Sequence, residues 1–165
     1  MELSGGDLRS IGRSNAVVLQ VQHQADFDAL FSCLFSKNRL VVMRAADAVE
    51  KITISRPQYL QKHKDELFQM CMVAKAKELK WHLALLLPRL TLQQHELATA
   101  WKLLKTWVTN KKAARIERVN ALQALFELSR KDPALTAELA RLMQALAAEN
   151  LPSLNARVKI LLKQL

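Results

Sequence analysis

The chain has 165 residues, of which half are hydrophobic and 24% are charged, and its formal net charge is +10. This composition is that of a folded chain about one domain long and excludes a disordered one. The chain has three glycines, all before residue 13. Sheets, tight hairpins and glycine-rich phosphate loops need positions of positive φ that glycine usually supplies, so the composition predicts helices joined by short polar turns.

The sequence gives no sign of export or of membrane insertion. The longest apolar run, residues 83–88, is far shorter than the ~18–20 residues that a membrane span requires. Residues 1–14 contain no apolar stretch of the signal-peptide type. Because the only cysteines are Cys33 and Cys71, no disulfide framework is implied. We therefore expect a cytoplasmic protein that makes no membrane contact.

Hydrophobic periodicity predicts the elements in chain order. A capping helix around residues 15–22 comes first. Four pairs of helices follow, at residues 26–35 with 39–53, 58–73 with 77–90, 92–108 with 114–129, and 134–149 with 153–164. Residues 91–94 have the form of a capping box, while Asp132-Pro133 and Pro152 are typical helix starts. Pro88 falls in the last turn of a predicted helix and is expected to bend it.

These pairs form a repeat of about 38 residues. Segments that begin at residues 45, 83 and 121 superpose without gaps, and a fourth begins at residue 158. Positions 1, 4, 5 and 8 of each copy are small or apolar, which defines one face of a helix. The preceding helices carry matching apolar triplets: Leu30, Cys33 and Leu34; Phe68, Cys71 and Met72; Leu104, Trp107 and Val108; Met143, Leu146 and Ala147. Stacked pairs would share one core, which neither helix of a pair could form alone.

The helix–turn–helix repeat resembles HEAT-like and armadillo-like repeat proteins, and the segments at residues 44–51 and 81–84 are similar to a group of small bacterial HEAT-like proteins without an assigned activity. The resemblance implies an all-α fold, a right-handed solenoid of about four antiparallel helix pairs with an N-terminal capping helix. It also implies one domain over residues 1–165, with the cap at 1–25 and repeats at about 26–54, 57–90, 91–129 and 133–165. HEAT repeats usually carry an arginine three residues before the first small core position. Lys80 and Arg118 fit this place, whereas Val42 and Asn155 do not.

The second helices of a helical solenoid line its concave side, and this side is the first candidate site. A rotation of 100° per residue predicts an apolar centre with a charged edge. The predicted partner-binding residues are Arg44, Asp47, Lys51, Trp81, His82, Arg89 and Phe126. The alternative is that this helix face is simply buried by neighbouring pairs, because the second inner helix is apolar nearly all round.

The turns inside three successive pairs are basic, and they form the second candidate site. Their cations are Lys37, Arg39, Lys75, Lys77, Lys80, Lys111, Lys112 and Arg115. Equivalent turns stack along one edge of a solenoid, so this stripe could follow a phosphate backbone and bind nucleic acid without sequence preference. The alternative is that the cations offset the negative ends of the first helices and keep the edge soluble.

The sequence carries no pattern typical of catalysis, of a metal or of a cofactor. We expect a non-enzymatic scaffold that holds a protein or peptide partner of unknown identity, as a monomer or weak dimer. Some HEAT-like proteins are DNA glycosylases that act on alkylated bases, with a basic concave face, aromatic residues and an aspartate. The resemblance therefore leaves a remote enzymatic alternative, in which Asp47, Arg44 and Trp81 would take these places.

Overall fold

A computed structural model describes residue 3 and residues 14–165, and every described element is helical. The chain divides into two compact units, residues 1–66 and 67–165, and each is described by itself. The boundary falls within α5 (Lys64–Val73). None of the helices in the described part of the chain is both long enough and apolar enough to cross a membrane.

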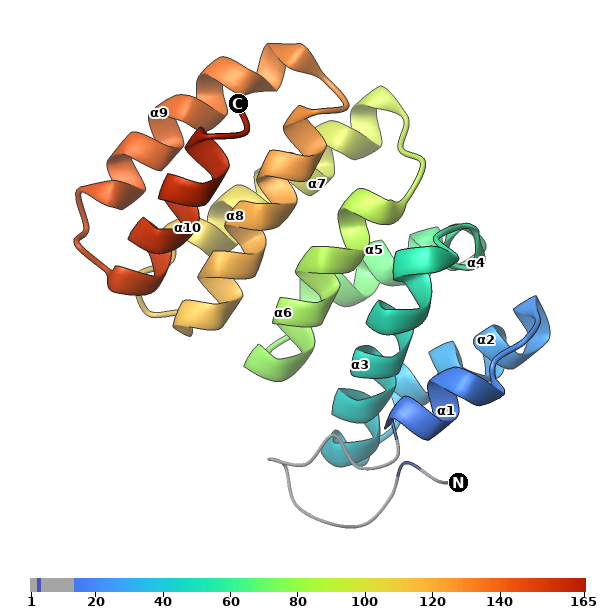
Figure 1. Ribbon diagram of the computed structural model, residues 1–165. Coiled ribbons are helices and arrows are strands. Elements are labelled where there is room, and N and C mark those ends of the chain that lie inside the picture. The colour runs from blue at the N-terminus through green and yellow to red at the C-terminus, as the bar shows by residue number, and fades with distance from the viewer. Residues whose placement is uncertain (1–2, 4–13) are drawn as a thin grey trace. The chain divides into compact units, whose positions relative to one another are not determined.

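Unit 1 packs a short N-terminal helix and one helix pair around a small core (Figure 1). Its elements are α1 (Ser14–Gln20), α2 (Gln24–Ser32), the 3-10 turn η1 (Cys33–Phe35), α3 (Arg39–Ser55) and the single turn α4 (Gln58–Gln61). Both α1 and α2 pack against α3. The helix α3 begins after Asn38, whose side chain accepts a hydrogen bond from the amide of Leu40 and so satisfies one free N–H group at the helix start.

Unit 2 is a stack of helices in which α8 is central (Figure 1). Its elements are α6 (Lys77–Leu86), η2 (Leu87–Arg89), α7 (Gln94–Thr109), α8 (Arg115–Ser129), η3 (Pro133–Leu135), α9 (Thr136–Ala147) and α10 (Pro152–Leu162). Contacts join α8 to α6, α7, α9 and α10, and α9 also packs on α10. The helices α6, α8 and α10 lie side by side, as second helices of successive repeats do.

The interior positions of the sequence repeat are confirmed. Ala45, Leu83 and Ala121 are fully buried, and Val158 is 3% exposed. The predicted N-terminal helix around residues 15–22 corresponds to α1. The predicted polar turns also form without glycine, since Asn150 supplies a positive φ of 55° in the turn between α9 and α10.

The second outer helix differs from the prediction of one helix over residues 58–73. It is interrupted between α4 and α5, and this interruption changes the face that α5 buries. Leu67, Met70 and Cys71 are buried, whereas Met72, which the repeat pattern placed in the core, is 65% exposed. The prediction for Met72 is therefore wrong, because it assumed one unbroken helical phase from residue 58 onward.

The observed end of α6 and the observed start of α7 also differ from the predicted boundaries, and each difference has a physical cause. Pro88 ends α6 at Leu86 and confines the remaining turn to a 3-10 helix, because its ring cannot continue an α-helical hydrogen-bond ladder. The predicted capping box at residues 91–94 is displaced by two residues. The amide of Gln93 donates to the Glu96 carboxylate at 2.7 Å, and α7 begins at Gln94.

The two cations at the arginine place of the repeat are engaged inside unit 2. Arg118 is 2% exposed, and it donates to the Val108 carbonyl at 2.7 Å and to both oxygens of Glu149. Lys80 pairs with Glu117 at 3.2 Å and lies 5.2 Å from the ring centre of Trp107. Both cations at the arginine place thus pair with glutamates that lie in other elements.

Shortening a side chain at the centre of the stack should destabilise unit 2 strongly. Leu122→Ala empties a fully buried site on α8, so we expect a loss of about 2–5 kcal/mol in the free energy of unfolding. Urea denaturation followed by circular dichroism measures this loss. Ile160→Ala on α10, where the side chain is 48% exposed, is the matched control and should cost less than about 1.5 kcal/mol. Equal losses would contradict the observed packing.

Removing the buried guanidinium should cost more than removing an exposed cation. Arg118→Met keeps the length of the side chain but leaves Glu149 and the Val108 carbonyl without their donor, and we expect about 3–5 kcal/mol of destabilisation. Lys105→Met breaks the exposed pair with Glu138 and should cost about 0–1 kcal/mol. The same urea titration compares the two variants, and an Arg118 variant as stable as the Lys105 variant would refute the role of this pair.

Candidate functional site

The second helices of unit 2 carry a set of partly exposed side chains that we call the inner face. We define it as the sector of α6, α8 and α10 that is not turned toward another helix. Its members are Leu85 and Arg89 on or just after α6, Ile116, Asn120, Gln123 and Glu127 on α8, and Arg157 and Ile160 on α10. All eight are partly exposed or exposed; Ile116 is 45% and Ile160 48% exposed. The inner face therefore combines aliphatic groups with amides and a few charges.

Hydrogen bonds between neighbouring helices hold the polar members of the inner face in place. Asn120 donates its amide N–H to the carbonyl oxygen of Trp81 at 3.2 Å, which joins α8 to α6. Arg157 donates to the side-chain oxygen of Gln123 at 2.8 Å, which joins α10 to α8. Gln123 in turn donates to Glu127 at 3.0 Å. These side chains are thus oriented before any partner arrives, which lowers the entropy cost of binding.

The same contacts correct the predicted orientation of the inner helices. Asn120 lies on the α6 side of α8, and Gln123 lies on the α10 side. Along an α-helix, residues three apart differ in direction by about 60°. The step from Asn120 to Gln123 rotates from the α6 side toward the α10 side, so the next step, to Phe126, points into the space between α8 and α10. It is 2% exposed. The prediction that Phe126 lines an accessible surface is therefore wrong, because a neighbouring helix covers that sector.

The predicted residues of α6 differ in their exposure. Trp81 and Arg89 are partly exposed, as the predicted surface requires. His82 is 7% exposed, and its ring centre lies 5.5 Å from that of Trp81. The expected exposure of His82 is therefore wrong, whereas Leu85, about one helical turn further along, is partly exposed like Trp81.

The corresponding face of α3 in unit 1 is already occupied. Arg44 is 2% exposed and donates to the carbonyl oxygen of Leu3 at 2.8 Å. The hydroxyl of Ser14 donates to Asp47, and Lys51 reaches both Asp47 and the side-chain oxygen of Asn15, at 2.6 and 2.8 Å. The expected exposure of Arg44 is therefore wrong. Groups that were predicted to face a partner are thus bonded to Leu3, Ser14 and Asn15.

The predicted basic turns lie on the surface. Lys37 and Arg39 are exposed before and at the start of α3 in unit 1. In unit 2 the exposed cations of the two turns before α6 and α8 are Lys75, Lys77, Lys111, Lys112 and Arg115. Lys80, which the sequence grouped with them, is instead largely buried against Glu117 and Trp107.

A model of the HEAT repeat domain family matches residues 9–165, which is nearly the whole chain. The chain belongs to the HEAT repeat family. No curated protein and no solved structure matches it. Membership in this family agrees with the all-helical elements and with the helix stack of unit 2. Proteins of this family are helical repeat scaffolds, which typically take part in protein interactions.

A cluster around His63 in unit 1 of the HEAT chain was not foreseen. The ring nitrogens of His63 lie 2.6 Å from an oxygen of Asp28 and 2.7 Å from an oxygen of Glu66. The ring stacks on Phe31 with a centre distance of 4.1 Å. Lys62 and Gln24 also donate to Asp28. Because Asp28 is 35 residues from His63, no local sequence signal could have found this cluster.

The His63 cluster has the features of a structural link between α2 and the start of α5. None of the hydrogen bonds described for His63 involves a hydroxyl or thiol group that could act as a nucleophile. The donors hold the pKa of the Asp28 carboxyl well below its usual range, through Lys62 first and then through Gln24 and His63. The cluster therefore ties two segments together through an ionised Asp28.

The two cysteines and the acidic and histidine side chains are the other described groups that could react or bind a metal. A pocket of about 430 Å³ in unit 1 is lined mainly by apolar side chains together with Gln20 and Asp26, and Cys33 lies in its wall. Burial raises the pKa of the Cys33 thiol, and it raises that of Cys71 further. A raised pKa disfavours the thiolate, which is the nucleophilic form. In the part of the chain that the structure describes, no three His, Cys, Asp or Glu side chains converge as metal ligands would.

Acid should weaken unit 1 through Asp28. A carboxyl whose pKa is lowered on folding stabilises the fold at pH values above its unfolded pKa of about 3.9, and this stabilisation is lost as the pH falls below that value. We expect wild-type stability to begin to fall at about pH 4 and to fall further as the pH is lowered to about 2, and Asp28→Asn to make this dependence shallower. Urea midpoints at a series of pH values measure it. The exposed Asp65→Asn is the control and should leave the pH dependence unchanged; an identical profile for both variants would exclude Asp28 as a source.

Proposed function

We propose that this HEAT repeat protein is a non-enzymatic scaffold that holds a protein or peptide partner on the inner face of unit 2. The proposal takes the chain as one right-handed solenoid of four helix pairs, as the sequence repeat predicts. The observation that carries it is the exposure of Leu85, Gln123 and Ile160. These residues occupy one equivalent position on three successive inner helices, at offsets of 38 and 37 residues.

The occupied face of α3 supports this choice of surface. Asp47 is the equivalent of Leu85 and Gln123 in unit 1, and it is already bonded to Ser14 and Lys51. A partner would have to displace those contacts at α3, whereas it would meet exposed groups at the inner face of unit 2. Apolar contacts to Leu85 and Ile160 at unit 2 would leave the existing hydrogen bonds of Asn120 and Gln123 in place.

The inner face also suggests what kind of partner it fits. Ile116, Leu85 and Ile160 offer aliphatic contacts to apolar side chains, and burying such groups supplies most of the favourable free energy of association. The amides of Asn120 and Gln123 carry paired donors and acceptors, as a peptide group does. A peptide segment with a few apolar side chains is therefore a better match than a small charged ligand.

A subtractive peptide selection tests the proposal. A random peptide library is displayed to the wild-type chain and depleted against the variant Leu85→Glu/Ile160→Glu. We expect peptides that bind the wild type with micromolar affinity and bind this double variant at least tenfold more weakly, because two carboxylates would be brought against an apolar ligand.

The control variant places the same charges on the outer helices. Ala98→Glu on α7 and Ala137→Glu on α9 change exposed positions away from the inner face, and they should leave peptide affinity unchanged. Circular dichroism confirms that each variant stays helical. If the selected peptides lose affinity equally for both double variants, or if no peptide discriminates the first variant from the wild type, the inner face is not the binding site.

A further inference from the structure

Five cations of unit 2 form a second surface, which we call the basic edge. They are Lys75, Lys77, Lys111, Lys112 and Arg115, in and just after the turns that precede α6 and α8. All five are exposed. Within the described part of the chain, none of them takes part in an ion pair. The basic edge is thus a group of positive charges with no counter-charge of its own.

Contacts between α6 and α8 show that the two basic turns lie beside each other. Lys80 reaches Glu117 at 3.2 Å, and Asn120 reaches the Trp81 carbonyl at the same distance. These bonds lie about one helical turn inside the starts of α6 and α8. The first residues of the two helices, Lys77 and Arg115, are therefore separated by about one interhelical distance, roughly 8–10 Å.

Nearby carboxylates do not neutralise the basic edge. Residues 74–80 and 110–118 contain two acidic side chains, Glu78 and Glu117. Glu78 is 9% and Glu117 4% exposed, and Glu117 is engaged by Lys80. Every exposed charge of these two segments is therefore positive.

Helix stability does not account for the two cations at the starts of α6 and α8. Cations stabilise a helix in its last turn, where the peptide dipoles leave partial negative charge. The last turns of α5 and α7 contain no basic residue. Instead, Lys77 and Arg115 are the first residues of α6 and α8, at the positive ends, where a cation is unfavourable. Lys75, Lys111 and Lys112 follow the ends of α5 and α7, where a cation is favourable, so the cost to the helices applies to Lys77 and Arg115 alone.

We propose that the basic edge binds the phosphate backbone of nucleic acid without sequence preference. Four of its five cations are lysines, which act as point charges toward phosphate and do not need the fixed geometry that base recognition requires. A span of roughly 10 Å corresponds to about three phosphates of one strand, or about six when both strands of a duplex are counted. The net charge of +10 adds a long-range attraction to the same polyanion.

An acidic protein segment fits the basic edge less well. Such a segment usually needs apolar contacts beside the charges, and Ile116 is the one exposed large aliphatic side chain of the described edge. The remaining exposed groups there, such as Asn110, are polar. Phosphates can bind this edge through charge alone. An acidic peptide would add few apolar contacts to the charge attraction.

Salt dependence of duplex binding is the direct test. Fluorescence anisotropy of a labelled 20-base-pair DNA of mixed sequence is titrated with the full chain at 50, 100 and 200 mM salt. If all five cations contact phosphates, the log–log slope is about −4 to −5, which corresponds to a loss of roughly 500-fold between 50 and 200 mM. Lys111→Gln/Lys112→Gln should reduce the magnitude of the slope by about two and weaken binding at 50 mM by about tenfold.

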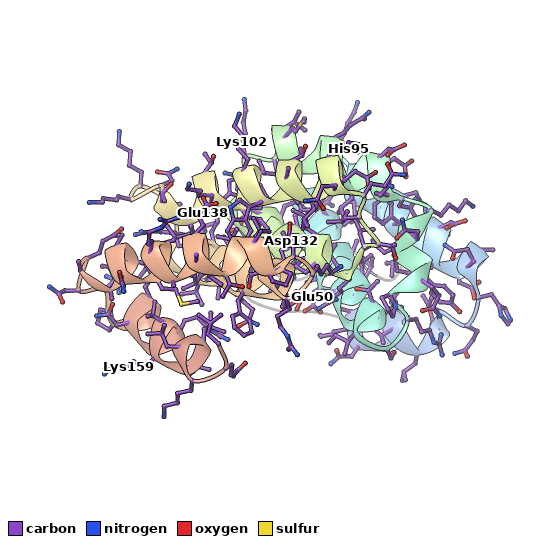
Figure 2. The ribbon with its side chains drawn as sticks, turned by 90° about the horizontal axis from the view of Figure 1, so that it is seen from above. Glu50, His95, Lys102, Asp132, Glu138 and Lys159 are labelled. Carbon is purple, nitrogen blue, oxygen red and sulfur yellow. The ribbon has the colours of Figure 1, made fainter. Side chains whose placement is uncertain are left out.

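A variant of equal net charge separates the basic edge from the overall charge. Lys102→Gln/Lys159→Gln removes two exposed lysines, on α7 and α10, whose side chains extend away from the helices (Figure 2). This control should keep the wild-type slope. Equal slopes for the two double variants, or no binding at 50 mM salt, would overturn the proposal. Tighter binding of a polyglutamate peptide than of the duplex would assign the edge to an acidic protein instead. The inner-face variants of the peptide experiment leave the basic edge intact, so each proposal can fail without the other.

Discussion

The structure of unit 2 depends on apolar area that α8 shares with its neighbours. Leu122, Ala124 and Leu125 are fully buried, and α8 contacts four other helices. A single helix pair has no such core, because each helix would leave part of its apolar surface in water. The helices of unit 2 therefore stabilise one another. Its inner and outer surfaces are consequences of where each helix meets the next one.

The same burial decides which side chains of α8 remain exposed to solvent. On α8 the sectors toward α6, α7 and α10 are closed, and the remaining sector presents Asn120, Gln123 and Glu127. The polar bonds that cross between the inner helices lie along this open sector. They fix the register of the stack and at the same time orient the groups that a partner would meet. Stability and the proposed binding thus use the same contacts.

The two units treat equivalent positions differently. In unit 1, Arg44, Asp47 and Lys51 are engaged by the N-terminal residues Leu3, Ser14 and Asn15. In unit 2, Asn120 is the equivalent of Arg44 and is partly exposed, whereas Arg44 is buried. Equivalence in the repeat is therefore a guide to position in the helix and not to exposure.

The sequence by itself determined most of the helices, the repeat and the interior positions at residues 45, 83, 121 and 158, because apolar spacing and turn residues act locally. It also located the basic turns, since charge at a turn is exposed wherever the turn is. Only the tertiary structure decided that Phe126 is covered while Gln123 is open, and that His63 meets Asp28. The difference between open and covered positions on an inner helix is a rotation of about 60°, and it is set by which neighbours the helix packs against. Periodicity gives the face that is buried against the paired helix, but the sectors beside it are assigned only when the adjacent repeats and the N-terminal segment are in place.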